Sequence, residues 1–225
     1  MSEPDPIAPV HPAIAGRQPE MAALADAVRR LVELSVATTA PASDVAAAAA
    51  GLDLIADLLG SYRPEAGASH SMGTPGQDTF AVSTMGERMP FDVVVGRYSP
   101  LALPVEITSD GRTARGRGRF TLPYEGPPGC IHGAVIAATF DIVFTAANIL
   151  AGAAGPTASL TLRYRRPTRL YEEAVFEATV ERTEGRRTFT SGRLVQGGVV
   201  TVEAEGVFVA LDRETTRSLA RRLEP

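Results

Sequence analysis

The residues with the clearest chemical potential lie in one stretch, EGPPGCIHGAVIAATFDIVFTAANIL, at residues 125–150. A loop rich in glycine and proline runs from Gly126 to Gly129 and leads into an apolar helix expected at about 133–151. The first N–H groups of a helix have no partner within it and lie at the positive end of its macrodipole. The amides of Gly133 and Ala134 are therefore suited to bind a carbonyl oxygen as it becomes negative. Tight packing explains a glycine at 133 equally well.

Asp141 is expected in the middle of this helix, among alanine, phenylalanine and β-branched residues. A buried carboxylate costs several kcal/mol unless it is partnered, so the placement indicates either a catalytic group or a satisfied structural one. In a cleft, the carboxylate could act as a nucleophile or as a general base for water. We expect Asp141 to be buried.

The distance between these two features constrains how they can cooperate. Seven or eight residues separate the Gly133–Ala134 amides from Asp141, which is about 10–12 Å along a helix. One small carbonyl cannot touch both. If both act on one substrate, they come from different subunits, and the chain forms an isologous homodimer with two composite sites.

His132 and Cys130 are further candidates for a catalytic group. His132 precedes the helix and does not share a face with Asp141, so a loop-fixing role is favoured over a general base. A Cys130–His132 nucleophile pair lacks a third, orienting group, and a small apolar role is commoner for a lone cysteine. His70, between two serines, is interpreted as a loop residue.

Composition excludes several other classes. The 22 basic residues are all arginine, which rules out Schiff-base and phosphate-loop lysines. One cysteine forms no internal disulfide, and three histidines make a metal site unexpected. A net charge of -4 and few aromatic residues argue against nucleic-acid binding. Polar residues interrupt the apolar stretch 131–155, so we expect no membrane span and a cytoplasmic location.

The elements around the site fall into two parts. Strands are expected at 104–107, 115–122, 159–165, 174–182, 187–195 and 199–210, with the apolar helix after the second of them. A helix apolar nearly all round must be wrapped, which predicts an α+β fold whose sheet curls around it and whose last four strands form a meander. Apolar residues spaced by three and four predict a helix at 18–38, and Ser43 is expected to cap a second helix ending at Gly60.

These patterns divide the chain into five segments. They are a disordered arm at 1–16, a helical hairpin at 17–60, a linker at 61–90, the main domain at 91–211 and a C-terminal tail at 212–225.

Three motifs in order resemble the hotdog-fold acyl-CoA thioesterases of the PaaI-like branch of the thioesterase superfamily. They are EGPPGxxHG with an acid nine residues after the histidine, PTASLTLRYRRPTRL at 156–170, and ERTEGRRTFTSGRLVQ at 181–196. The resemblance covers about residues 97–211. Ala134 departs from it, since the family usually has a second glycine there. An alanine keeps the backbone N–H that could bind the oxyanion, but its methyl group narrows the space through which a substrate approaches the backbone.

The resemblance implies hydrolysis of an acyl-CoA by a catalytic Asp141, an oxyanion amide at Gly133 or Ala134, and a hydroxyl partner at Thr157. It implies a loop-orienting role for His132, and a homodimer or a tetramer. No metal or redox cofactor is expected, because CoA is part of the substrate. An apolar acyl group is expected beside Val143, Phe144 and Ile149. Four arginines are candidates for the CoA phosphates: Arg165, Arg166, Arg186 and Arg187.

Two alternatives stay open at this point. One is an enoyl-thioester hydratase on the same fold, which needs a histidine paired with a carboxylate. The other is an acyl-CoA sensor or scaffold that binds the thioester without cleaving it.

Overall fold

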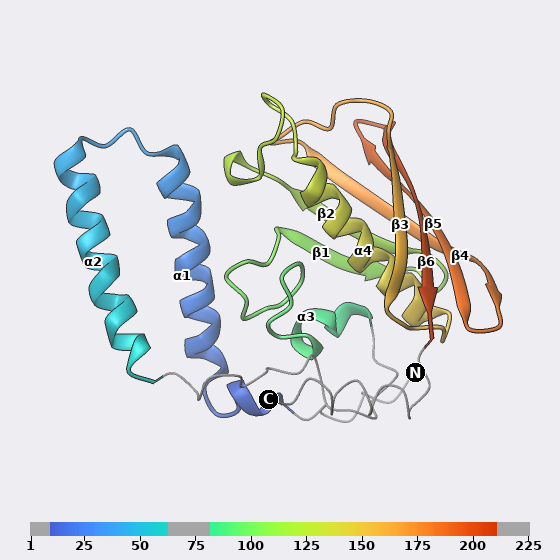
Figure 1. Cartoon of the computed structure of the whole chain (residues 1–225), viewed down its shortest axis with the longest axis horizontal. Helices are drawn as coiled ribbons and strands as arrows, with labels where there is room; N and C mark the ends of the chain where they lie inside the picture. Colours follow the sequence, from blue (N-terminus) through green and yellow to red (C-terminus); the bar gives the residue numbers. More distant parts are fainter. Residues whose placement is uncertain (1–9, 63–81, 211–225) are drawn as a thin grey trace.

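The computed structural model describes residues 10–62 and 82–210. A six-stranded antiparallel sheet, in the order β1-β2-β4-β5-β6-β3, curls around helix α4, Gly133–Leu150 (Figure 1). The strands are β1 Val105–Ser109, β2 Ala114–Arg119, β3 Thr157–Tyr164, β4 Glu173–Glu184, β5 Arg187–Gln196 and β6 Val199–Val209. The predicted α+β architecture, with a sheet around a long central helix, is confirmed.

The path of the last four strands differs from the expected meander. Strands β4, β5 and β6 form one, but β3 pairs with β6 and lies at an edge of the sheet. Sequence order suggested that β3 would lie beside β4, but β2 occupies that place. The chain therefore crosses from β3 to β4 over the sheet, and one edge of β3 pairs with no other described strand.

Glycines let the central helix approach the sheet closely. A Cβ at Gly192 on β5 would lie 2.5 Å from a ring carbon of Phe144, and one at Gly206 on β6 would lie 2.7 Å from the same ring. On β2, a Cβ at Gly116 would come within 2.8 Å of Val143. Since both helix side chains are fully buried, these glycines are needed for packing.

Helix α4 has its apolar composition because it forms the core. Phe140 packs edge-on against a ring from β4 and Phe144 edge-on against a ring from β6, and the two helix rings are tilted against each other. Among the described residues, α4 is the one helix long and apolar enough to cross a membrane by length and composition, and half of its apolar window is buried inside the protein. Its hydropathy is thus accounted for by the sheet that wraps it.

The N-terminal helices agree with the predicted hairpin, apart from one cap. Helix α1 spans Gln18–Ala37 and α2 spans Ala42–Gly60. The prediction that Ser43 caps α2 is wrong, because the helix begins one residue earlier. Pro41 occupies the N-cap position without a side-chain bond, and the Ser43 hydroxyl donates to Asp44. Within the predicted arm, Pro12–Ile14 forms a 3-10 turn and Ile14 is buried.

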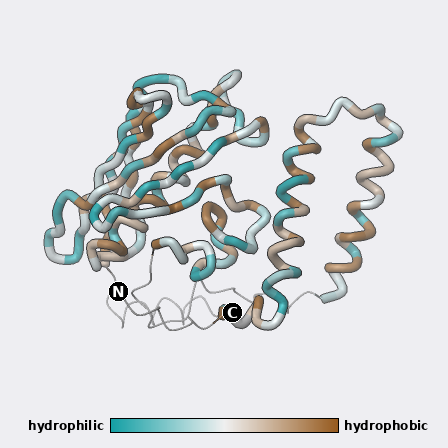
Figure 2. Tube along the Cα trace, turned by 180° about the vertical axis from the view of Figure 1, so that it is seen from behind, coloured by the Kyte–Doolittle hydropathy of each residue, from teal (hydrophilic) through white to brown (hydrophobic). Residues whose placement is uncertain are grey.

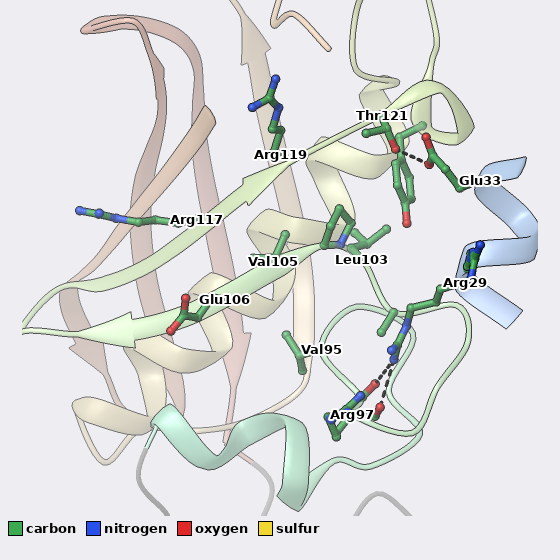
Figure 3. Close-up of a pocket in the computed structure, with 15 residues that line it drawn as sticks. Arg29, Glu33, Val95, Arg97, Leu103, Val105, Glu106, Arg117, Arg119 and Thr121 are labelled. Carbon is green, nitrogen blue, oxygen red and sulfur yellow. Dashed lines mark hydrogen bonds between the residues drawn. The ribbon is translucent and has the colours of Figure 1, made fainter. Parts of the chain in front are cut away.

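Helix α1 is attached to the rest of the protein by polar contacts. The Arg29 guanidinium donates to three backbone carbonyls, those of Gly96, Arg97 and Ser99, at 2.7–3.2 Å. Figure 3 shows the first two of these bonds. One turn further along, the hydroxyl of Thr121 donates to Glu33 at 2.6 Å. Carbonyls bound by a charged donor are held more strongly than by a neutral one, so α1 has a defined position on the domain.

Part of the predicted linker is structured. Val82–Thr84 forms a 3-10 turn and Met85–Arg88 forms the short helix α3, with Val82 and Met85 buried in the core. The composition of the predicted linker gave no sign of these two short helical segments, because Val82 and Met85 belong to no periodic apolar pattern. His70 and the tail at 212–225 lie outside the described residues.

Candidate active site

The start of α4 is fixed by the histidine that precedes it. His132 is the N-cap, and its Nδ1 accepts the backbone N–H of Ala134 at 3.0 Å. Its own N–H donates to the carbonyl of Tyr124 at 2.8 Å. These two bonds connect His132 to the loop and to the helix end, and a loop-orienting role for it stays a prediction. Because Nδ1 accepts a bond, the neutral ring carries its proton on Nε2.

This cap distinguishes between the two amides considered for the oxyanion. The N–H of Ala134 is already donated to His132. The N–H of Gly133 has no hydrogen-bond acceptor among the residues that the structure describes. Gly133 thus presents the free donor at the positive end of α4. Ala134, the residue that departs from the family pattern, is thus the one whose N–H is bound by His132, and it is not the candidate oxyanion donor.

Sequence reasoning missed one residue at this end of the site. The Tyr164 hydroxyl, from the end of β3, donates to the carbonyl of Gly133 at 2.9 Å. A Cβ at Gly133 would lie 3.1 Å from that oxygen, so Tyr164 covers the glycine closely. Partial burial raises the pKa of Tyr164, which keeps it a neutral donor. Its place in the RYRRP segment was the available signal.

At the other end, Asp141 meets the predicted hydroxyl partner. Thr157 Oγ1, at the start of β3, donates to Asp141 Oδ1 at 2.6 Å. Asp141 is half-buried in the single chain, not buried as expected, because Thr157 lies on the exposed edge strand and leaves one side of the carboxylate open. Oδ2 makes no hydrogen bond to a described residue. One oxygen is thus held and the other is available for chemistry.

Strand β3 connects the two ends of the site. It begins at Thr157, against Asp141, and ends at Tyr164, against Gly133. Along α4, eight residues separate Gly133 from Asp141, about 12 Å. The free amide and the free carboxylate oxygen therefore do not meet within one chain, and the structure has two half-sites joined by an edge strand.

The four arginines proposed for CoA phosphates do not gather in one chain. Arg165 and Arg166 follow the end of β3, whereas Arg186 and Arg187 lie at the turn beside its start, since Arg187 pairs with Val209. Arg165 is ion-paired with Glu203 at 2.7 Å, and Arg186 donates to a backbone carbonyl. Arg166 and Arg187 have no ion pair among the described residues.

The expected acyl lining is wrong for two residues. Val143 and Phe144 are fully buried against the sheet, and Ile149 is half-buried. An open groove of about 640 Å³ lies elsewhere, between α1 and the β1–β2 edge. Figure 3 shows Arg117 and Arg119 projecting from β2 away from the middle of this groove. It reaches Tyr124, whose carbonyl holds His132, and so touches the site only at that loop.

A curled antiparallel sheet around one long helix, with a glycine at the helix start and an acid within it, defines the hotdog class of protein. Comparison with known proteins agrees. The family profile described as the thioesterase superfamily matches residues 128–203. The crystal structure of a thioesterase superfamily protein is 34% identical, covering 84% of this chain and 94% of that one, with a TM-score of 0.69. The chain belongs to the thioesterase superfamily.

Two further relatives extend the comparison. The acyl-coenzyme A thioesterase THEM4 of Bos taurus is 36% identical over 95 residues, which is 41% of this chain and 39% of that protein. The chain thus matches about two fifths of the length of this curated relative. Zebra fish thioesterase superfamily member 2 is 16% identical over 58% of this chain and 99% of that one, with a TM-score of 0.51, a likeness of fold.

Proposed function

We propose that this protein is an acyl-CoA thioesterase, which hydrolyses an acyl-CoA to the free acid and CoA. The observation that carries the proposal is the bond from Thr157 to Asp141, which holds one carboxylate oxygen and leaves the other free. The free amide of Gly133 supplies the second component, a donor for the thioester oxygen. The THEM4 relative, named as an acyl-coenzyme A thioesterase, supports the substrate class.

The complete site in this proposal needs two chains. One edge of β3 is unpaired among the strands that the structure describes, and two of its eight residues, Leu160 and Leu162, are partly buried while the other six are exposed. Exposed strand edges are templates for pairing with another chain. If β3 pairs antiparallel with β3 of a second copy about a two-fold axis near its middle, Thr157 of one chain comes opposite Tyr164 of the other. Asp141 then faces the Gly133 amide of the partner copy, at each of two sites.

The chemistry follows from this pairing. The thioester carbonyl oxygen accepts the Gly133 N–H, which stabilises the negative charge as the carbonyl carbon becomes tetrahedral. Asp141 either attacks that carbon or takes a proton from the water that attacks it. The carbon–sulfur bond then breaks, the CoA thiolate leaves and is protonated, and the acyl group ends as the carboxylic acid. Attack by Asp141 itself needs a second step, in which water cleaves the resulting anhydride.

The same pairing offers a place for the CoA phosphates. An antiparallel arrangement brings Arg186 and Arg187 of one chain to the strand end where Arg165 and Arg166 of the other lie. Arg166 and Arg187, which have no ion pair among the described residues, are the best placed to bind phosphate. Arginine suits this role because its planar donors match phosphate oxygens.

The hydratase alternative is disfavoured by the histidine. A hydratase needs His132 free for acid–base work beside a carboxylate, yet its Nδ1 accepts the Ala134 N–H. No carboxylate of a described residue is hydrogen-bonded or ion-paired to His132. The binding-only alternative is left to experiment.

A panel of acyl-CoA esters, scored by release of the CoA thiol, tests the function. We expect turnover of esters with apolar acyl groups and slower turnover of acetyl-CoA, with no loss of rate when a metal chelator is added. Crotonyl-CoA should lose thioester absorbance without forming a hydroxyacyl product. Tight calorimetric binding without thiol release would instead identify a sensor.

Thr157 gives a graded test of the site. Thr157→Ala removes a hydrogen bond to a charged oxygen, worth about 1.5–3 kcal/mol, so kcat should fall by roughly 10–100-fold. Thr157→Ser keeps the hydroxyl and should retain most of the activity. Steady-state thiol release for the two variants makes the comparison. Equal losses in both would assign Thr157 to strand packing and not to the carboxylate.

A further inference from the structure

Helix α1 of the N-terminal hairpin contacts the domain through charged residues and leaves two leucines exposed on its opposite side. On α1, Arg29 and Glu33 make the contacts with the domain. At 100° per residue, Leu31 and Leu34 lie on the opposite side of the helix, and they are 40% and 52% exposed. The contact that fixes α1 therefore leaves its leucine side uncovered.

No part of the chain that the structure describes buries a residue of helix α2. None of its residues is buried, although it is 19 residues long and largely apolar. Its exposed large side chains, 42–72% accessible, are Val45, Leu52, Leu54, Ile55, Leu58 and Leu59. Helical periodicity places all six on one half of the circumference. Asp53 and Asp57 lie on the other half, and Asp44, in the first turn, lies on the apolar half. Figure 2 shows this apolar composition along the outermost helix.

The two helices do not cover each other. They run side by side but stand apart in both views (Figures 1 and 2). The six side chains of α2, with Leu31 and Leu34, expose on the order of 800 Å², about what one partner contributes to a stable interface. The summed apolar area of these side chains is larger than the patch that a monomer commonly exposes, so it indicates a binding surface for another macromolecule.

Charge indicates which partner fits. The charged residues of α2 are all aspartates, so the helix is repelled by an anionic membrane. On α1, Arg30 lies one turn from Leu34 at the rim of the apolar face and has no ion pair with a described residue. When two copies face each other, α1 of one can lie beside α2 of the other, with Arg30 near Asp57. The surface is thus complementary to itself.

We propose that the hairpins of two chains pack together about a two-fold axis and form a four-helix bundle. Two open pairs of amphipathic helices bury their apolar faces in such a bundle. This interface is distinct from the one proposed for β3. Helix α1 packs against the turn Leu122–Tyr124 that follows β2, whereas β3 is the edge strand at the other end of the sheet order. Together the two interfaces would assemble a tetramer.

The test is the mass of the full chain in solution, measured by light scattering on a sizing column. The double variant Leu54→Glu with Leu58→Glu places two charges in the apolar face and should halve the mass. A matched control, Ala46→Glu with Ala50→Glu, has the same spacing on the aspartate side and should keep the wild-type mass. Since glutamate is a good helix former and α2 has no buried residue, thermal melting of the domain should be unchanged in both.

Other outcomes overturn the proposal. Equal masses for wild type and the Leu54→Glu/Leu58→Glu variant would show that the hairpins do not pair. So would a halved mass in the control, or wild-type chain that stays unpaired in solution and sediments with phosphatidylcholine vesicles. If the double variant fails to fold, Leu58→Ser replaces it. That substitution should raise the concentration at which the assembly dissociates on dilution by at least tenfold, and an unchanged value would contradict pairing.

Discussion

Asp141→Asn is expected to lower kcat for acyl-CoA hydrolysis by about a thousandfold or more, with the fold intact. The amide is nearly the same size and still accepts the Thr157 hydroxyl, but it is neither a nucleophile nor a base for water. Thiol release under saturating substrate measures the loss. Because Asp141 is half-buried and forms no ion pair with a described residue, the melting temperature should change little.

A suitable control is Glu106→Gln, which removes a carboxylate from the exposed face of β1 and should keep wild-type turnover. Substrate binding provides a second readout. Calorimetric affinity of the Asp141→Asn protein for an acyl-CoA should stay close to that of wild type, because the carboxylate acts on the reacting carbon and not on the CoA moiety. Turnover within threefold of wild type would remove Asp141 from the mechanism.

Two inactive variants are expected to restore activity when they share a dimer. Gly133→Val alone should reduce turnover at least a hundredfold, since even a Cβ at this position would lie 3.1 Å from the Tyr164 hydroxyl and crowd the free amide. In a dimer of this variant with Asp141→Asn, one site carries both defects and the other carries neither. Equal mixing makes half of the dimers mixed, so about a quarter of wild-type activity should return.

The measurement is thiol release after the two chains are unfolded and refolded together, or co-expressed with different tags and purified over both. Each variant refolded alone supplies the baseline. Activity that stays at that baseline, with mixed dimers present by mass, would place the amide and the carboxylate of each site in one chain. The result thus separates the composite arrangement from the chemical assignment of Asp141.

The sequence predicted where the helices and strands lie better than it predicted which strands pair with each other. Periodicity located the wrapped helix and the six strands to within a few residues, because each pattern reflects the burial of its own face. The position of β3 could not be obtained in this way. Which strands pair depends on the path of the chain over the sheet, and the pattern within Thr157–Tyr164 is the same beside either neighbour.

The site was predictable where spacing or charge made a residue unusual. Asp141 is unusual as an acid in an apolar helix, whereas Thr157 looks like an ordinary strand threonine and is indicated only by the family resemblance. Tyr164 carried no comparable signal, since an exposed strand tyrosine is ordinary until its hydroxyl is seen on the Gly133 carbonyl. The choice between two adjacent amides likewise required the His132 bond to be seen.

The edge strand has a consequence for how this protein can change. β3 contacts Asp141 at one end and Gly133 at the other. In the proposed pairing, the register of the two β3 strands therefore sets the distance between the carboxylate of one chain and the amide of the other. A slip of two residues along that pairing would keep every side chain on its face yet shift the two half-sites by about 7 Å. An insertion near either end of β3 would thus leave each chain able to fold and would still abolish catalysis at both sites of the dimer.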